Sequence, residues 1–510
     1  MTKIPSSLSS SSSSPSHPER SLGSVLINYG GPGVSGYTSS FTFGKNIHRS
    51  IGGKFDVISW DPRGIGRTRP VVDCWGGELE ASVVKANMPE ELGLEVLPRL
   101  QLHHNDSSSS SSSSPDPILT FQLERFLAQN KLQASRCASS NTSNAEMLKH
   151  LGTTTLIKDT ERINAVLEGP EAMINGIGGS YGTIWAAYLL GMLPGKVGKV
   201  VAHGVADPVM WATEHYESYD LLDVLLTDAE KSLEAFYRAC YDAGQTDCPL
   251  VRSRDHSWRD IQRRVDGFLE DVYHAPLAAW EARRPGLVTS GYIRQSLFQT
   301  LQLPSLWKPF ASALSDAMYN SKSTALRDFL LPPTSVLNQV RLGQTGQSDL
   351  SRLAVSCADA PRYRENEKLP TPEGMASRLE RIRRETSPTF GATVAMMEQH
   401  GGCQFWPQSD KPAERFEGPW NTTLANPVLI MSNVYDPITP SISGEKMSAL
   451  YGNMSRHVVT ESFGHSYLAW PQRCWSGVLT DYFERGILPE DGHLCRATAN
   501  ETNVFRDYKP

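Results

Sequence analysis

The sequence predicts an α/β protein in which a mostly parallel central sheet has helices on both faces and is interrupted by a large helical insertion. Strand-like and helical segments alternate in residues 25–208 and again in residues 421–510, an order typical of βαβ units. Residues 209–420 instead read as long amphipathic helices. A chain of 510 residues with 39% apolar residues is long enough for this core and its insertion.

The first part of the core, residues 25–208, contains short apolar runs bounded by turn residues. Such runs indicate buried strands, and apolar residues at three- and four-residue spacing indicate helices. The predicted strands are 25–29, 55–60, 172–177 and 197–202, and the predicted helices are 155–167 and 183–192.

The insertion and the second part of the core follow. In the insertion, residues 209–420, the same spacing rule predicts helices at 219–243, 258–273 and 293–303. In residues 421–510 the alternation resumes, with strands at 427–431 and 456–461 and helices at 441–451 and 475–485. The insertion therefore divides one sheet into two stretches of sequence.

Two serine runs, 9–14 and 107–114, cannot bury enough apolar surface to fold. We therefore expect residues 1–24 to form a disordered tail and the second run to lie in a surface loop. The tail has no hydrophobic segment that would serve as a signal peptide. No apolar run approaches the roughly 18 residues that a membrane-spanning helix needs.

The charge balance excludes one class of partner. Lysine and arginine number 49 against 55 aspartate and glutamate residues, which gives a net charge of −6 without any basic block. Nucleic acid is therefore not expected as the main partner.

Eight cysteines leave two interpretations open. They include no CxxC pair, and no Cys/His cluster has the spacing of zinc ligands. Buried unpaired thiols are one interpretation, and disulfides are the other, with Cys240 and Cys248 spaced to close a small loop. Glycosylation is a further possibility, because five Asn-x-Ser/Thr sequons occur, at Asn105, Asn141, Asn421, Asn453 and Asn500.

The strongest local motif surrounds Ser180. Gly178-Gly179-Ser180-Tyr181-Gly182 is a G-x-S-x-G sequence between a predicted strand and a predicted helix. A nucleophile elbow needs small residues two positions before and after the serine, because the strand turns sharply into the helix there. The motif predicts Ser180 as a nucleophile.

A nucleophilic serine needs a histidine base, and the base needs a carboxylate that fixes its tautomer. Asp436 lies just after the strand 427–431, and His465 lies on the loop after the next strand, so both match the order Ser, Asp, His. Asp207, after the strand 197–202, is the rival acid. The other histidines considered, His203, His400 and His457, are expected to be structural or exposed.

The third element is the glycine-rich segment Asn28-Tyr29-Gly30-Gly31-Pro32-Gly33 after the first strand. Glycines there let backbone N–H groups approach a developing oxyanion. Because proline has no N–H, we expect Gly31 to be one donor, with the backbone N–H of Tyr181 as the other.

These motifs together resemble the tripeptidyl-aminopeptidase-like branch of the α/β-hydrolases, relatives of the proline iminopeptidases. The resemblance rests on the segment from Gly30 to Gly33, on Asp61-Pro62-Arg63-Gly64-Ile65-Gly66, on the Ser180 motif and on residues 427–440. In the C-terminal part it extends to Cys403 with Trp406, to Gly464-His465-Ser466 and to the tail from Leu488 to Cys495. It covers nearly everything from Val25 onward and is weakest within the insertion.

The resemblance implies an α/β-hydrolase fold with the insertion as a helical cap, and release of short peptides or single residues from peptide N-termini. It also implies an acidic cap residue for the substrate amine, for which Glu398 and Asp359 are candidates. Relatives are commonly secreted, which would suit paired cysteines. They have further strands before the first strand seen here, so we expect the sheet edge beside it to need covering.

Two other functions remain open from the sequence. The same three residues would serve a hydrolase of esters, lactones or thioesters in small-molecule metabolism. Loss of N-terminal strands would instead leave an inactive binding or structural protein. No metal or cofactor is expected under any of these readings.

Overall fold

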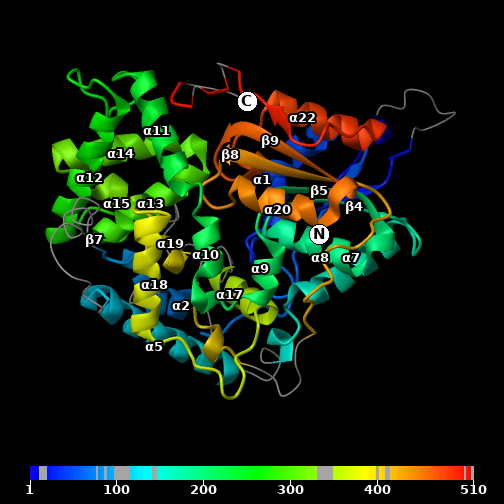
Figure 1. Ribbon diagram of the computed structural model, residues 1–510, viewed down its shortest axis with the longest axis horizontal. Helices are drawn as coiled ribbons and strands as arrows, with labels where there is room; N and C mark the ends of the chain where they lie inside the picture. Colours follow the sequence, from blue (N-terminus) through cyan, green and yellow to red (C-terminus); the bar gives the residue numbers. More distant parts are fainter. Residues whose placement is uncertain are drawn as a thin grey trace.

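The computed structural model describes residues 1–10, 20–75, 78–85, 89–96, 115–139, 146–329, 348–397, 401–407, 414–498, 501–502 and 504–506. Its centre is a sheet of eight strands in the order β1-β3-β2-β4-β5-β8-β9-β10 (Figure 1). The strands are β1 (Thr2–Ile4), β2 (Ser24–Asn28), β3 (Asp56–Ser59), β4 (Ile174–Ser180), β5 (Val197–Val205), β8 (Val428–Tyr435), β9 (Ser455–Phe463) and β10 (His493–Cys495). Every neighbouring pair is parallel except β1 with β3.

Both faces of the sheet are buried, because successive side chains of a strand point to opposite sides. In β2, Val25 and Ile27 belong to the apolar cluster that contains Trp475, whereas Leu26 belongs to the cluster that contains Trp185. The covering helices are α1 (Gly36–Ser50) and α22 (Arg473–Thr480) on the first side, and α7 (Thr153–Glu168), α8 (Tyr181–Met192) and α20 (Ser441–Tyr451) on the second. The predicted α/β class is confirmed.

The expected disordered tail over residues 1–24 is wrong for the residues nearest the N-terminus. Thr2–Ile4 form β1, which pairs antiparallel with β3, and the backbone N–H of Ser6 donates to Asp56 Oδ1 at 2.8 Å. The physical reason is the unpaired N–H and C=O groups of β3, which this short strand covers. The sheet edge that the sequence left open is therefore occupied by a segment of the same chain. Part of the tail, 11–19, lies outside the described residues.

The helix predicted over residues 219–243 is in fact two helices, α10 (Asp220–Leu225) and α11 (Ala229–Ala243). At the break, the Asp228 carboxylate accepts a hydrogen bond from the backbone N–H of Ser441, at the start of α20, at 3.2 Å. A tertiary contact with the core thus interrupts a segment whose apolar spacing favours a continuous helix.

The insertion contains most of the remaining helices, which gather beside the carboxyl ends of the strands (Figure 1). They are α9 (Pro208–Thr213), α12 (Trp258–His274), α13 (Ser290–Gln302), α14 (Trp307–Asn320), α15 (Thr324–Asp328), α17 (Ser348–Asp359), α18 (Pro372–Glu385) and α19 (Thr393–Met397), with the hairpin β6 (Leu277–Ala279) and β7 (Gly286–Val288). Helices from before residue 209, namely α2 (Glu78–Lys85), α3 (Pro89–Leu92) and α5 (Pro117–Ser139), join them, and α5 packs against α18.

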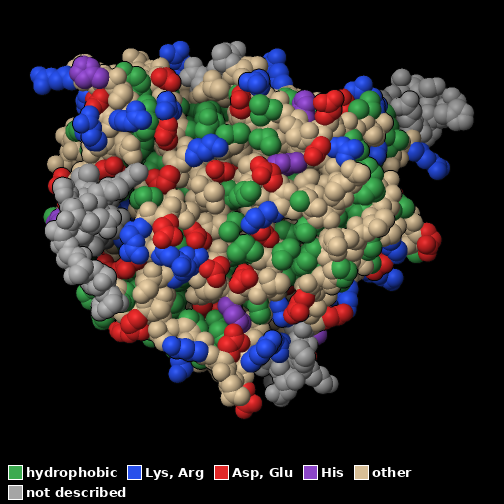
Figure 2. Space-filling model, in the orientation of Figure 1, with side chains coloured by type: hydrophobic (Ala, Val, Ile, Leu, Met, Phe, Trp, Pro, Cys, Tyr) green, Lys and Arg blue, Asp and Glu red, His purple; other side chains and the backbone are tan. Residues whose placement is uncertain are grey.

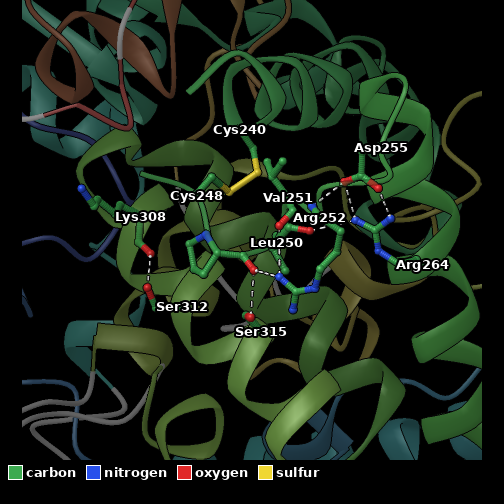
Figure 3. Close-up of a disulfide and its surroundings, with 11 residues drawn as sticks. Cys240, Cys248, Leu250, Val251, Arg252, Asp255, Arg264, Lys308, Ser312 and Ser315 are labelled. Atoms are coloured by element: carbon green, nitrogen blue, oxygen red, sulfur yellow. Dashed lines mark hydrogen bonds and ion pairs between the residues drawn. A yellow bond between two sulfur atoms is a disulfide. The ribbon is translucent and has the colours of Figure 1, made fainter. Parts of the chain in front are cut away.

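All eight cysteines are paired, which decides between the two interpretations left open by the sequence. The disulfides are Cys74–Cys137, Cys240–Cys248, Cys357–Cys403 and Cys474–Cys495. Next to the second of them, the Arg264 guanidinium contacts the buried Asp255 carboxylate at 2.5 Å and the Leu250 carbonyl at 2.8 Å (Figure 3). The disulfide and this ion pair together fix the turn between α11 and α12.

The surface carries both charges. On the face drawn in Figure 2, lysine and arginine side chains alternate with aspartate and glutamate without a large region of one sign. Among the described helices, none is both long and apolar enough to cross a membrane. The second serine run, 107–114, and three of the five sequons, Asn105, Asn141 and Asn500, fall outside the described residues.

Candidate active site

Ser180 is the last residue of β4, and α8 begins at the next residue. Its φ of 58° and ψ of −127° lie in a region that residues other than glycine rarely adopt. A Cβ on Gly178 would lie 2.0 Å from the Gly182 carbonyl oxygen, and a Cβ on Gly182 would lie 2.3 Å from the Asn28 carbonyl oxygen. The two outer glycines of the motif are thus needed because backbone approaches backbone, as a nucleophile elbow requires.

Asp436 and His465 are in direct contact on the loops after β8 and β9. The His465 Nδ1 lies 3.1 Å from both carboxylate oxygens of Asp436. The Asp436 side chain is fully buried, whereas the His465 side chain keeps 17% of its surface exposed and Ser180 is also half-buried. The Asp436 carboxylate is therefore hidden, whereas His465 and Ser180 remain accessible.

The charged form of Asp436 is stabilised by several donors. The backbone N–H groups of Ile438, Thr439 and Ser466 donate to its oxygens at 3.1, 2.9 and 2.8 Å. Burial alone would raise the pKa of this carboxyl, but His465 and these hydrogen bonds hold the pKa below its usual range. An ionised Asp436 fixes the proton on Nδ1 of His465 and leaves Nε2 free to act as a base.

Two residues that support this pair were missed by the sequence reasoning. The Thr439 hydroxyl donates to Asp436 Oδ2 at 2.6 Å and lies 3.0 Å from His465 Nδ1. The Asn433 amide donates to the carbonyls of Gly464 and Ser466 at 2.9 and 3.0 Å, and so fixes the loop that carries His465. The only available signal was position, because both residues lie within three residues of Asp436.

The register of the sheet brings the elbow to the same edge as the Asp436–His465 pair. Ser180 is paired with Val205 of β5, and β8 lies on the other side of β5. At the end of β5, a Cβ on Gly204 would lie 2.8 Å from the Ser466 Cβ and 3.1 Å from the Thr439 hydroxyl oxygen. The loops after β8 and β9 therefore close over the end of β5, directly beside the elbow.

The glycine segment after β2 lies against the elbow. A Cβ on Gly30 would lie 2.5 Å from the Gly179 carbonyl oxygen, 2.8 Å from the Ser180 Cβ and 3.2 Å from the Tyr181 nitrogen. Gly30 and Gly31 have φ of 103° and 107°, which a residue with a side chain would adopt only at a cost. The two backbone amides predicted as oxyanion donors, those of Gly31 and Tyr181, thus belong to segments in close contact.

The Tyr181 side chain leads to a buried carboxylate. Its hydroxyl lies 2.7 Å from the Thr153 hydroxyl, which donates to Asp359 Oδ2 at 2.6 Å. Asp359 also accepts from the backbone N–H of Thr153 at 2.8 Å and from the Trp211 indole at 2.9 Å. Burial raises the pKa of the Asp359 carboxyl to about 6 although these donors lower it. Asp359, which was a candidate for binding the substrate amine, keeps 3% of its surface exposed and already has Thr153 and Trp211 as hydrogen-bond partners.

The remaining candidate residues have other partners or lie outside the described part. The rival acid Asp207 caps α9 and lies 3.4 Å from Lys446 Nζ.

His203 is buried beneath Gly179, and burial together with the nearby His465 lowers its pKa to about 3. His457 lies in β9, 3.0 Å from the Ser432 hydroxyl. Glu398 and His400 are not among the described residues.

One group among the described residues has the spacing of metal ligands. Cys474, His493 and Cys495 offer ligand atoms within 4.8 Å of one another, but the two sulfur atoms are bonded to each other as a disulfide. Metal ligation needs thiolates, so this group does not fit a metal in its present form.

Comparison with known proteins finds a family model and curated peptidases that resemble this chain. Residues 387–495, which include Asp436 and His465, match a family model described as TAP-like protein. The chain is 23% identical to "Serine protease Hip1" of Mycobacterium tuberculosis over 481 residues, which are 93% of this chain and 81% of that protein. It is 25% identical to "Tripeptidyl aminopeptidase" of Streptomyces coelicolor over 188 residues, 36% of this chain and 29% of that protein. The predicted resemblance and the α/β-hydrolase fold are confirmed.

Proposed function

We propose that this chain, an α/β-hydrolase-fold serine hydrolase with a TAP-like C-terminal region, is an exopeptidase that releases single residues or short peptides from peptide N-termini. The observation that carries the proposal is the contact between Asp436 and His465, at the sheet edge where the Ser180 elbow meets the Gly30–Gly31 segment. Similarity to a serine protease and to a tripeptidyl aminopeptidase supports peptides as substrates.

In the proposed reaction, Ser180 Oγ attacks the scissile carbonyl while His465 Nε2 accepts the serine proton. Asp436 stabilises the resulting imidazolium, and the N–H groups of Gly31 and Tyr181 donate to the oxyanion. The tetrahedral intermediate collapses when His465 returns the proton to the leaving amine. A water molecule, activated by the same histidine, then hydrolyses the acyl-enzyme and restores Ser180.

The test is a comparison of substrates on the purified chain and on its Ser180→Ala variant. A tripeptide amide with a free amine, its N-blocked twin and a simple aryl ester are each assayed for turnover. The proposal predicts that the free-amine peptide is cleaved, that the blocked twin is not, and that Ser180→Ala abolishes cleavage. Turnover of the ester alone would instead support a non-peptide acyl hydrolase, and wild-type turnover by Ser180→Ala would contradict the mechanism.

A further inference from the structure

Helix α17 lies within the insertion, yet it contacts the segments of both expected oxyanion donors. At one position, the Arg352 guanidinium donates from Nη2 to the Gly31 carbonyl oxygen at 2.8 Å. Further along the helix, Asp359 accepts a hydrogen bond from the Thr153 hydroxyl. That hydroxyl also lies 2.7 Å from the hydroxyl of Tyr181. Arg352 and Asp359 are seven residues apart, which is about two helical turns, so they lie on the same side of α17.

Several further contacts keep α17 in place. Leu353 and Ala354 are buried in the main apolar cluster, and Cys357 forms the disulfide with Cys403. The Ser351 hydroxyl donates to the Gly64 carbonyl, on the loop after β3, at 2.9 Å. Because Arg352 and Asp359 extend from a fixed helix, their hydrogen bonds restrict the two segments that they reach.

We infer that Arg352 and Asp359 are positioning residues for the oxyanion hole, and that α17 holds its two donors at the correct separation. Arg352 acts on Gly31, and Asp359 acts on Tyr181 through Thr153. Neither residue touches the substrate. The inference rests on the proposed function only in assuming Ser180 as nucleophile and the N–H groups of Gly31 and Tyr181 as donors.

The chemistry gives these contacts a specific consequence. An oxyanion hole acts on the transition state, because its donors must lie about 3 Å from the oxygen only when the carbonyl carbon becomes tetrahedral. Loosening the Gly31 segment should therefore lower kcat and leave KM nearly unchanged. Loosening the Tyr181 segment should likewise lower kcat and leave KM nearly unchanged. Partial unfolding would instead lower the concentration of active enzyme, and the molecules that remain folded would keep the wild-type kcat and KM.

The variants follow from the contacts. Arg352→Met removes the hydrogen bond to Gly31 and keeps the length of the side chain, and Arg352→Lys restores a donor. Tyr181→Phe removes the hydroxyl that meets Thr153 and keeps the backbone N–H. Ser351→Ala is the matched control, since it removes a hydrogen bond of the same helix to Gly64, outside the oxyanion segments.

The measurements are the second-order rate of fluorophosphonate labelling, kcat and KM on the best substrate found, and the thermal unfolding midpoint of each variant. Labelling needs the nucleophile and the oxyanion hole but no peptide specificity. We expect Arg352→Met and Tyr181→Phe each to lower the labelling rate and kcat by about 10- to 100-fold, with KM within about twofold. Arg352→Lys should recover most of the loss, and Ser351→Ala should keep wild-type rates.

Two results would overturn the inference. One is a labelling rate and kcat in Arg352→Met and Tyr181→Phe equal to those of the wild type. The other is an equal loss in Ser351→Ala, which would show that α17 only stabilises the fold. Failure of the proposed function is recognised separately. Turnover of the aryl ester without turnover of the free-amine peptide would contradict the exopeptidase assignment and leave this inference standing, whereas labelling that persists in Ser180→Ala would contradict Ser180 as the nucleophile.

Discussion

At the scale of single residues, the Asp436–His465 pair depends on groups close to it in sequence. Thr439 and the backbone of Ile438 come from the turn that follows Asp436, and Ser466 follows His465. The order Ser, Asp, His could be predicted from the sequence, because the prediction requires only that each residue follows a predicted strand. The role of Thr439 could not be predicted, because a threonine between prolines also occurs in turns that have no function.

Replacing Asp436 tests the orientation of His465. Asp436→Asn keeps the size of the side chain but removes the charge that stabilises the imidazolium and fixes the Nδ1 proton. We expect kcat and the labelling rate to fall by about 10⁴-fold. The measurement is single-turnover labelling at pH 7.5.

Asp207→Asn is the matched control for this substitution, since Asp207 was the rival acid. Asparagine can cap α9 as aspartate does, so the substitution mainly removes the charge that faces Lys446 Nζ. It should lower the free energy of unfolding by about 1 kcal/mol at most, with no change in the labelling rate. A large loss of labelling in Asp207→Asn together with none in Asp436→Asn would reverse the assignment.

At the scale of elements, the sequence predicts where backbone geometry is set locally. The strand before Ser180 and the helix after it were found because an apolar run ends in closely spaced glycines. Helix α1 was not predicted, since Gly36–Ser50 is rich in serine, threonine and glycine, which have low helix propensity. It forms because its buried face, including Ile47, packs against the sheet.

Contacts between distant elements were beyond prediction from the sequence. Arg352 and Gly31 are 321 positions apart, and Thr153 and Asp359 are 206 apart. No local pattern marks either pair, since an arginine and an aspartate on an amphipathic helix are usually solvent-exposed. Only the packing of the insertion on the core brings them together.

The contact between Asp359 of α17 and Thr153 of α7 predicts how the stability of the fold depends on pH. The folded chain holds the pKa of Asp359 at about 6, against an ordinary value of 3.8. Between these two pKa values, Asp359 binds a proton in the folded state but not in the unfolded state. Its contribution to the free energy of unfolding therefore rises as the pH falls from about 7 to 4. The difference between the two pKa values corresponds to about 3 kcal/mol at most.

Asp359→Asn isolates this contribution from the other groups that titrate in the same range. We expect the free energy of unfolding of the wild type to increase, relative to that of Asp359→Asn, when the pH is lowered from 7.5 to 5. Denaturant titration of both proteins at several pH values measures it. Parallel pH curves for the two proteins would contradict the raised pKa of Asp359.

At the scale of the whole molecule, the insertion contacts the candidate active site at three places. Besides the contacts of Arg352 and Asp359, the carbonyl of Gln302 accepts a hydrogen bond from the backbone N–H of His465 at 2.8 Å. Gly464 lies so close to Pro304 that a Cβ would approach its ring to 2.6 Å. The insertion therefore contacts the segments that carry Gly31 and His465, and we expect replacement of its helices to move both segments.

The measurement that tests the central claim most directly is identification of the residue that a fluorophosphonate modifies in the intact chain. The account predicts one modified peptide, containing Ser180, with labelling lost in Ser180→Ala and strongly slowed in His465→Ala. Modification of a different serine, or undiminished labelling of Ser180→Ala, would contradict the assignment of Ser180 as the nucleophile.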